Sequence, residues 1–220
     1  MNEFNFIKES ETIKTEGDSI FASEYIIKLR NTEMSSNLLM MVSLSFRKEG
    51  MYIHVDVSFD NESYGYIDLL IADQVEAFRL TGEQDPLAAL RFFGEKKVSS
   101  SIITNGSKPV SIYSDGKFFN YNGFCEMPVS RKVTDELRNT QGGDTTGCGD
   151  NFAGGILASV VSQLRNGTQH PDLMEVCSWG VVSGGFACFY LGGTYFEEKA
   201  GEKKAKMKPY YDAYRKQLQD

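Results

Sequence analysis

The sequence predicts an α/β fold in which helices cover both faces of a mostly parallel sheet. Short apolar runs rich in β-branched residues alternate with segments of helical periodicity along most of the chain, and this alternation favours a parallel sheet. The chain has 220 residues, of which 41% are hydrophobic and 24% are charged. This composition suits one folded domain with a sizeable core over residues 1–220.

The first half of the chain is predicted to begin with a strand at residues 18–23 and a helix at residues 35–50. This helix is expected to end at Gly50, because Arg47 and Lys48 suit the negative end of a helix. Beyond it, β-branched and aromatic runs predict strands, and periodic apolar residues predict helices. The strands are residues 51–57, 66–72 and 98–104, and the helices are residues 73–80 and 86–94.

The second half is predicted to contain a hairpin followed by helices. Two β-rich runs lie on either side of Asp115-Gly116 in residues 109–123, and an Asp-Gly pair is a strong hairpin signal. A helical region is then expected to continue to about residue 190, with Asn166-Gly167 as a stop signal within it. Its apolar face is expected to consist of Phe152, Ile156, Leu157, Val160, Val161 and Leu164.

Charge and hydropathy exclude several kinds of partner. The net charge of −7 argues against a protein that binds nucleic acid, because that affinity relies on clustered Lys and Arg. The basic run EKKAKMK, residues 202–208, is interpreted as a solvated face, and residues 208–219 as a surface helix. The N-terminal residues do not resemble a signal peptide, and no apolar window is long enough to cross a bilayer, so a cytoplasmic protein without membrane contact is expected.

The cysteines and histidines argue against a zinc site and against a disulfide framework. The four cysteines form no CxxC pair, and the two histidines lie far apart in the sequence. These residues are Cys125, Cys148, Cys177, Cys188, His54 and His170.

The stretch NTQGGDTTGCGDNFAGGILASVV, residues 139–161, has six glycines in front of an apolar run. A helix N-terminus carries unpaired N–H groups and a partial positive charge, and glycine lets an anion approach them without a Cβ in the way. The stretch is therefore a candidate anion site. It lacks the lysine of a Walker loop, and Phe152 stands where the dinucleotide fingerprint needs its third glycine, so neither standard phosphate motif applies.

Asp150 falls in the first turn of this predicted helix. The positive end of the helix would keep its carboxylate ionised at neutral pH and ready to accept a proton. Alternatively, the residue serves only to cap the helix, which acidic residues in first turns often do. Position alone favours the capping interpretation.

The segment DTTGCGDNFAGG, residues 144–155, resembles the C-terminal signature of the ribokinase-like, or PfkB-type, carbohydrate kinases. The resemblance implies that Asp150 is the catalytic base. It also implies that the backbone N–H groups of Gly147, Cys148 and Gly149 form an anion hole, which stabilises charge on the transferring phosphoryl group. The family usually has Ala or Gly where this chain has Cys148, but a backbone role tolerates a small side chain.

The resemblance extends to residues that would organise cations. The segment ADQVEAFRLTG, residues 72–82, is similar to the family's NxxE segment, which helps to organise magnesium and phosphate. Glu76 matches this segment, whereas Asp73 replaces the usual Asn. The alternative for both residues is a solvated acidic face at the start of a helix. The resemblance also implies that Asp144 contributes to a monovalent-cation site of the kind that some relatives have.

Two more segments resemble the ATP site of the family. Residues 102–116 are similar to the strand and turn whose TxG element lies near the nucleotide phosphates, which implies that Thr104 and Gly106 contact ATP. Pro109 replaces a second glycine and removes a backbone donor there. Residues 177–193 correspond to a small-residue helix and loop beside the adenine, although tight helix packing explains the same composition equally well.

The resemblance covers roughly residues 18–218 and implies a ribokinase-like three-layer fold that lacks the family's N-terminal strands and β-sheet lid. The implied activity is ATP-dependent phosphoryl transfer to a hydroxyl of a sugar or a related small molecule, with Mg²⁺ as cofactor. Two alternatives stay open: a catalytically weak nucleotide-binding or interaction protein, and a nucleoside kinase of the same superfamily. Because a sheet that is cut part-way exposes a strand edge, the chain is also expected to form a homo-oligomer or to self-associate.

Overall fold

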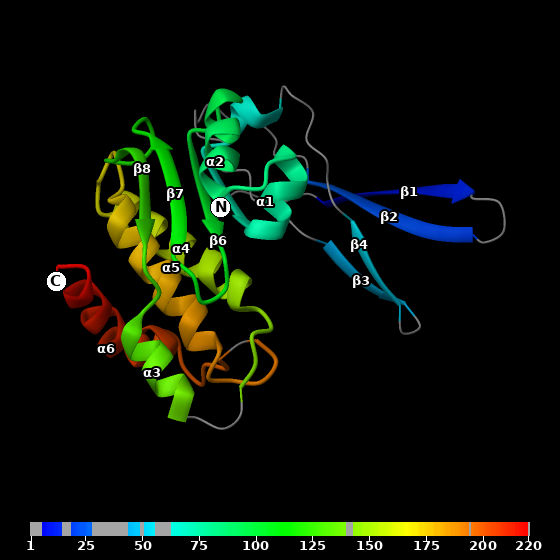
Figure 1. Cartoon of the computed structure of the whole chain (residues 1–220). Helices are drawn as coiled ribbons and strands as arrows, with labels where there is room; N and C mark the ends of the chain where they lie inside the picture. Colours follow the sequence, from blue (N-terminus) through cyan, green and yellow to red (C-terminus); the bar gives the residue numbers. More distant parts are fainter. Residues whose placement is uncertain are drawn as a thin grey trace. The chain divides into compact units, whose positions relative to one another are not determined.

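A computed structural model of the chain divides into two units, Met1–Ser36 and Asn37–Asp220. The first unit contains an antiparallel pair of strands, β1 (Phe6–Lys14) and β2 (Ser19–Ile27) (Figure 1). The predicted strand at residues 18–23 is therefore confirmed, and it continues to Ile27. The residues that the structure describes are 6–14, 19–27, 44–48, 51–55, 63–139, 143–193 and 195–219.

Strands β3 (Leu44–Lys48) and β4 (Met51–Val55) form a second antiparallel pair. The predicted helix at residues 35–50 is wrong over residues 44–48, and the rest of it lies outside the described residues. The sequence LSFRK alternates apolar and polar residues with the period of a strand, and its register with β4 pairs Phe46 with Ile53. The strand predicted at residues 51–57 is confirmed as far as Val55, beyond which it lies outside the described residues.

The main sheet has the strand order β5-β6-β7-β8. Strand β5 runs parallel to β6, whereas the β6–β7 and β7–β8 pairs are antiparallel. The described sheet is therefore mixed, which corrects the expectation of a mostly parallel one. Short connections explain the difference, because only an antiparallel neighbour can be reached without a long crossover. The four strands are β5 (Leu69–Asp73), β6 (Ser100–Thr104), β7 (Val110–Asp115) and β8 (Asn122–Met127).

The predicted hairpin is confirmed, but its connection is longer than the Asp115-Gly116 signal suggests. The register pairs Asp115 with Asn122, so residues 116–121 form a loop rather than part of the second strand. The aromatic residues that gave this segment its β-like composition include Phe119, which is completely buried in the core instead.

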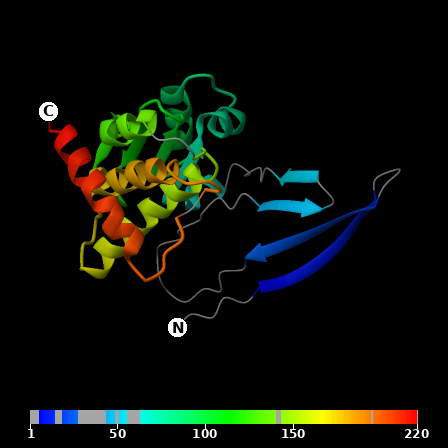
Figure 2. The same cartoon turned by 90° about the horizontal axis from the view of Figure 1, so that it is seen from below.

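Helices cover both faces of the main sheet, as predicted (Figure 2). Alternate strand residues separate into two cores: Leu69 and Ile102 contribute to one, and Leu70 and Ile103 to the other. The first core also contains residues of α4, α5 and α6, whereas the second contains residues of α1 and α2. The helices are α1 (Gln74–Thr81), α2 (Pro86–Glu95), α3 (Arg131–Asn139), α4 (Cys148–Arg165), α5 (Leu173–Ala187) and α6 (Glu202–Gln217).

The predicted helical region after the glycine-rich stretch consists of two helices, α4 and α5. Asn166 caps the end of α4 and Gly167 adopts a φ of 85°, so the predicted stop is confirmed. The apolar face of α4 is narrower than predicted, because Val161 and Leu164 are more than 40% exposed. Phe152, Ile156 and Val160 form the buried part of this face.

The last helix differs in extent and in burial from its prediction. Helix α6 begins at Glu202, within the basic run that was interpreted as a solvated face. Its Tyr214 side chain is completely buried, so α6 is a packed helix and not only a surface one. Within the described residues, no helix combines the length and the apolar character that a membrane span would need.

Candidate active site

The turn before α4 depends on close contacts between backbone segments. Gly147 is the N-cap of α4 with a φ of 71°, which is the left-handed region that favours glycine. A Cβ on Gly147 would lie 2.7 Å from the carbonyl oxygen of Gly193, and one on Gly143 would lie 2.1 Å from that of Cys188. The loop after α5 therefore packs directly against the turn, and only glycine fits at these two positions.

The residues of the predicted anion hole lie at the start of α4, with Gly147 as the N-cap and Cys148 and Gly149 in the first turn. The Cys148 N–H donates a 3.3 Å hydrogen bond to the Thr145 carbonyl within the turn. Asn151 is the first residue of α4 whose N–H donates to the carbonyl of the N-cap, with a distance of 2.9 Å to Gly147 O. A Cβ on Gly149 would meet no atom of another segment within 4 Å, so the space beside that residue is open.

Asp150 is exposed in the first turn of α4, but it does not cap the helix. The N-cap is Gly147, and no side-chain hydrogen bond caps this end. Among the described residues the Asp150 carboxylate makes no hydrogen bond and no ion pair, and it faces a cavity of about 570 Å³. The capping interpretation is therefore not supported, and a carboxylate at the rim of a cavity remains available to a ligand.

A polar chain connects this turn to helix α6. Asn151 Nδ2 donates to Gly147 O at 2.8 Å and to Gly193 O at 2.6 Å. The Oδ1 atom of Asn151 accepts from Lys203 Nζ, and burial lowers the pKa of this lysine below its ordinary value. No sequence signal points to Lys203, which lies in the basic run EKKAKMK that is interpreted as a solvated face. These hydrogen bonds join the turn, the loop after α5 and helix α6 beside Asp150.

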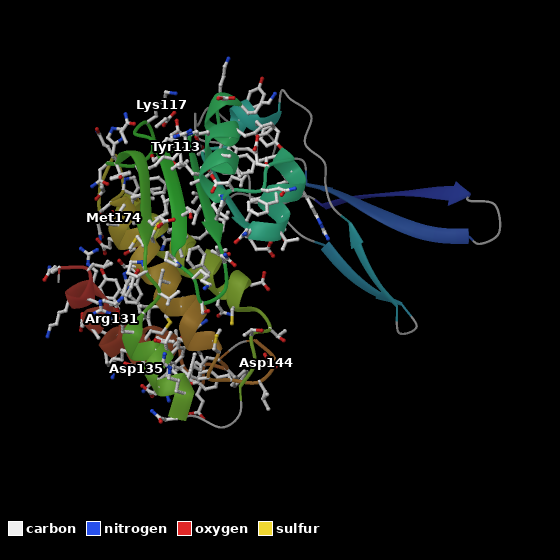
Figure 3. The ribbon with its side chains drawn as sticks, viewed as in Figure 1. Tyr113, Lys117, Arg131, Asp135, Asp144 and Met174 are labelled. Carbon is white, nitrogen blue, oxygen red and sulfur yellow. The ribbon has the colours of Figure 1, made fainter. Side chains whose placement is uncertain are left out.

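Asp144 stabilises the preceding part of the turn (Figure 3). Its Oδ1 accepts the Thr146 N–H at 2.9 Å, and its Oδ2 accepts the Gly192 N–H at 3.4 Å. These backbone donors, chiefly Thr146, hold the pKa of the Asp144 carboxyl below its ordinary value. The structure therefore gives Asp144 a role in the shape of the turn, and its predicted role at a monovalent-cation site stays a prediction.

Asp73 and Glu76 form a capping box at the start of α1. Asp73 Oδ1 accepts the Glu76 N–H at 2.8 Å, and Glu76 Oε2 accepts the Asp73 N–H at 2.9 Å. One oxygen of each carboxylate is thus used by the helix. Across the described ranges, no group of three or more His, Cys, Asp and Glu side chains could hold a metal ion. The predicted role of Asp73 and Glu76 in organising magnesium stays a prediction.

Thr104 and Gly106 lie where strand β6 ends. Thr104 is the last residue of β6 and pairs in register with Asp73 of β5, so these two predicted site residues are neighbours. Gly106 adopts a φ of 54° in the turn that follows. Figure 1 places the start of α4 at this same end of the sheet. The structure therefore gathers the predicted residues at one end of the sheet, where open α/β sheets bind their ligands.

The small residues of α5 allow it to pack tightly against α4. A Cβ on Gly155 would lie 2.6 Å from the Trp179 carbonyl oxygen, and one on Gly180 would lie 2.7 Å from the Ile156 side chain. Helix packing therefore accounts for the composition of residues 177–187, and a contact with adenine stays a prediction. At the end of this interface, the Sγ atoms of Cys148 and Cys188 lie 3.1 Å apart.

Comparisons with known proteins agree with this fold. A protein-family model described as pfkB family carbohydrate kinase matches residues 56–200, which is more than half of the chain. The ribokinase of Haemophilus influenzae is 22% identical over 176 residues, which cover 70% of this chain and 53% of that protein. The chain thus spans about half the length of this curated relative.

Solved structures show the same partial coverage. A pyrophosphate-dependent myo-inositol-1 kinase converted by mutation into a myo-inositol-3 kinase has a TM-score of 0.52 and 16% identity, over 76% of this chain and 50% of that one. A putative ribokinase II from E. coli, in complex with ATP and Mg²⁺, has a TM-score of 0.47 and 17% identity, over 69% of this chain and 41% of that one. The likeness to the inositol kinase shows a shared fold.

Proposed function

The chain belongs to the pfkB family of carbohydrate kinases, and we propose that it transfers the γ-phosphoryl group of ATP to a hydroxyl of a sugar or a related small molecule. The observation that carries this proposal is the state of Asp150. Its carboxylate is exposed beside a cavity of about 570 Å³, lies at the positive end of α4, and is not used to cap that helix. A free carboxylate in this position suits a general base.

In the proposed reaction, Asp150 takes the proton of the substrate hydroxyl as its oxygen attacks the γ-phosphorus. The N–H groups at Gly147, Cys148 and Gly149 stabilise the charge that develops on the phosphoryl oxygens. Full use of this hole requires the Cys148 N–H to leave the Thr145 carbonyl, to which it donates at 3.3 Å. Such a long bond is weak, so the cost of this change is small.

The other residues of the site hold the turn and the nucleotide. Asn151, supported by Lys203, holds the turn before α4 against the loop after α5, while Thr104 and Gly106 lie near the phosphates. Mg²⁺, when bound, would neutralise part of the phosphate charge. Asp73 and Glu76 would orient its water ligands through the carboxylate oxygens that the capping box leaves over. A monovalent cation near Asp144 is a further part of this proposal.

A direct assay tests the proposed reaction. The purified chain is mixed with ATP, Mg²⁺ and a panel of sugars and nucleosides, and phosphorylated products are identified by mass spectrometry while ADP release is followed. The expected result is a phosphorylated sugar whose formation requires Asp150, with the Asp150→Asn variant binding ATP but transferring little. Equal product formation by both proteins would show that Asp150 is not the base. A nucleoside product would identify a nucleoside kinase of the same superfamily.

One observation favours a second candidate, a nucleotide-binding protein with little transfer. The Cys148 N–H already has an acceptor within the turn, so a nucleotide could bind at Gly149 without completing the hole. The two candidates differ in one measurement. ATP binding by calorimetry, without any phosphorylated product over a wide panel of hydroxyl compounds, would support the second candidate and contradict the first.

A further inference from the structure

Two cysteines lie side by side where α4 begins and α5 ends. Cys148 is the first residue of α4, Cys188 caps α5, and their Sγ atoms are 3.1 Å apart although the residues are separated by 40 positions in the sequence. Both are free thiols and both side chains are partly exposed. The other two cysteines differ from this pair, because Cys177 is completely buried and Cys125 lies on strand β8.

The backbones that carry the two thiols are held against each other by the packing of α4 and α5. A Cβ on Gly184 would lie 3.0 Å from the carbonyl oxygen of Cys148, and one on Gly143 would lie 2.1 Å from that of Cys188. The sulfur atoms therefore need to approach by only about 1 Å to reach the length of a disulfide bond. Side-chain rotation can supply a movement of this size without a shift of either helix.

We propose that Cys148 and Cys188 are a redox modification site that forms a reversible disulfide with a small-molecule disulfide, such as oxidised glutathione, as the oxidant. One protein thiolate attacks a sulfur of the oxidant, forms a mixed disulfide and releases one glutathione thiolate. The second protein thiolate then attacks the protein sulfur of the mixed disulfide and releases the other glutathione. Two protein S–H bonds are lost, one protein S–S bond forms, and the two protons end on two molecules of reduced glutathione.

The surroundings of Cys148 oppose the formation of its thiolate. Burial, together with the neighbouring Cys188 thiol and the Asp144 charge, raises the pKa of Cys148 to about 12. Because the thiolate is the nucleophile, thiol–disulfide exchange at this pair is slow at neutral pH.

The disulfide would act on the turn that the proposed kinase function assigns to the phosphates, and this consequence rests on that function. In the thiol form, the Cys148 N–H donates to Thr145 O and must move away from it to complete the anion hole. A bond to Cys188 restrains that movement by tying Cys148 to the end of α5. Oxidation therefore weakens ATP binding, and bound ATP opposes oxidation by the same factor.

Incubation of the full chain in glutathione redox buffers tests the site directly. Peptide mass spectrometry and thiol counting are expected to show a cross-link between the two residues, with two thiols lost in each chain and restored by dithiothreitol. Cys148→Ser and Cys188→Ser should each abolish the cross-link, whereas the control Cys125→Ser should retain it. Circular dichroism verifies that all three variants are folded. Persistent glutathione adducts without a cross-link, or the same thiol loss in Cys148→Ser, would overturn the proposal.

ATP binding to the two redox forms tests the consequence separately. Calorimetry is expected to show that ATP affinity falls by roughly tenfold in the oxidised chain. Equal ATP affinities of the reduced and oxidised chains would overturn the proposal that the disulfide restrains the turn. If the reduced chain does not bind ATP, the proposed kinase function fails, but the cross-link and its dependence on both cysteines are still expected. The two failures are therefore distinguishable.

Discussion

Helices α1 and α4 both begin with an acidic residue in or next to the first turn, but they satisfy that turn in different ways. At α1, Asp73 and Glu76 each accept a backbone N–H, so the end of the helix is closed by its own side chains. At α4, the cap is Gly147, which has no side chain to offer, and the Asp150 carboxylate stays free among the described residues. A closed end stabilises the fold, whereas an open end can bind an anion.

Acidic residues at the start of a helix therefore have two expected roles here: they cap the helix, or they stay free for a ligand. Asp85 of α2 and Asp172 of α5 follow the α1 pattern, since each accepts an N–H from three residues later. The α4 end departs from it at the residues that the family resemblance assigns to phosphate transfer. Variants at the N-terminal ends of α1 and α4 are therefore the most direct tests of the role proposed for Asp150.

The largest expected effect comes from removing the free carboxylate. Asp150→Asn is expected to leave ATP affinity within a few-fold and to lower phosphoryl transfer by roughly two or more orders of magnitude, as for the loss of a positioned base. Single-turnover assays and calorimetry measure the two quantities. Unchanged turnover would make the α4 end functionally equivalent to the α1 end and would remove Asp150 from the proposed mechanism.

Two glycine variants test separately whether glycine is needed for the conformation of the turn and whether it is needed to leave space for a ligand. Gly147→Ala is expected to lower the free energy of unfolding by roughly 2–4 kcal/mol, because alanine is strained at a positive φ and its Cβ would meet the Gly193 carbonyl. Gly149→Ala should not destabilise the fold, because its Cβ enters open space in a helix. If that open space takes the phosphates, Gly149→Ala should nevertheless weaken ATP binding. Urea denaturation and calorimetry on both variants provide the comparison.

The capping difference itself predicts a smaller effect on stability. Asp73→Ala is expected to lower the free energy of unfolding by about 1 kcal/mol, because the Glu76 N–H loses its side-chain acceptor. Asp150→Ala is expected to change it by no more than about 0.5 kcal/mol, since this carboxylate bonds to nothing among the described residues. Comparable losses in both variants would mean that Asp150 stabilises its helix after all.

The smallest expected effect concerns pH. The Thr146 and Gly192 N–H groups hold the pKa of Asp144 below its ordinary value. The contribution of Asp144 to stability is therefore fully present above the ordinary carboxyl pKa, and it is lost as the pH falls through the lowered folded-state pKa. Asp144→Asn should remove this part of the acid dependence. Melting temperatures measured between neutral and acidic pH for both proteins would reveal it, and identical profiles would argue against these hydrogen bonds.

Local signals predicted helices α1, α2 and α4 well, whereas no signal predicted α3. Helix α4 ends at the Asn166-Gly167 stop, and the D-x-x-E pattern at Asp73 was visible in the sequence although it was interpreted as a cation site or a solvated face. The segment at residues 44–48 is wrongly predicted as a helix because the leucine-rich sequence before it suggests one. Its own residues alternate between apolar and polar, as in a strand. These errors arise where two local patterns overlap.

The tertiary partners of the candidate site had no comparable signal. Gly193, Cys188 and Lys203 contact the turn from residues 40 or more positions away, and such contacts depend on how α5 and α6 pack. The cysteine spacing even argued against a disulfide framework, because the sequence contains no CxxC motif. Residue types and their order identified the turn, but the groups that hold it in place required the fold.

The bond between Lys203 and Asn151 has a consequence for how the protein is made. Asn151 leaves the ribosome well before Lys203, which follows it by 52 residues, and domains begin to fold while synthesis continues. The glycine turn of a nascent chain is therefore incomplete until helix α6 has emerged and docked. We expect the proposed nucleotide affinity to be complete only at that late stage.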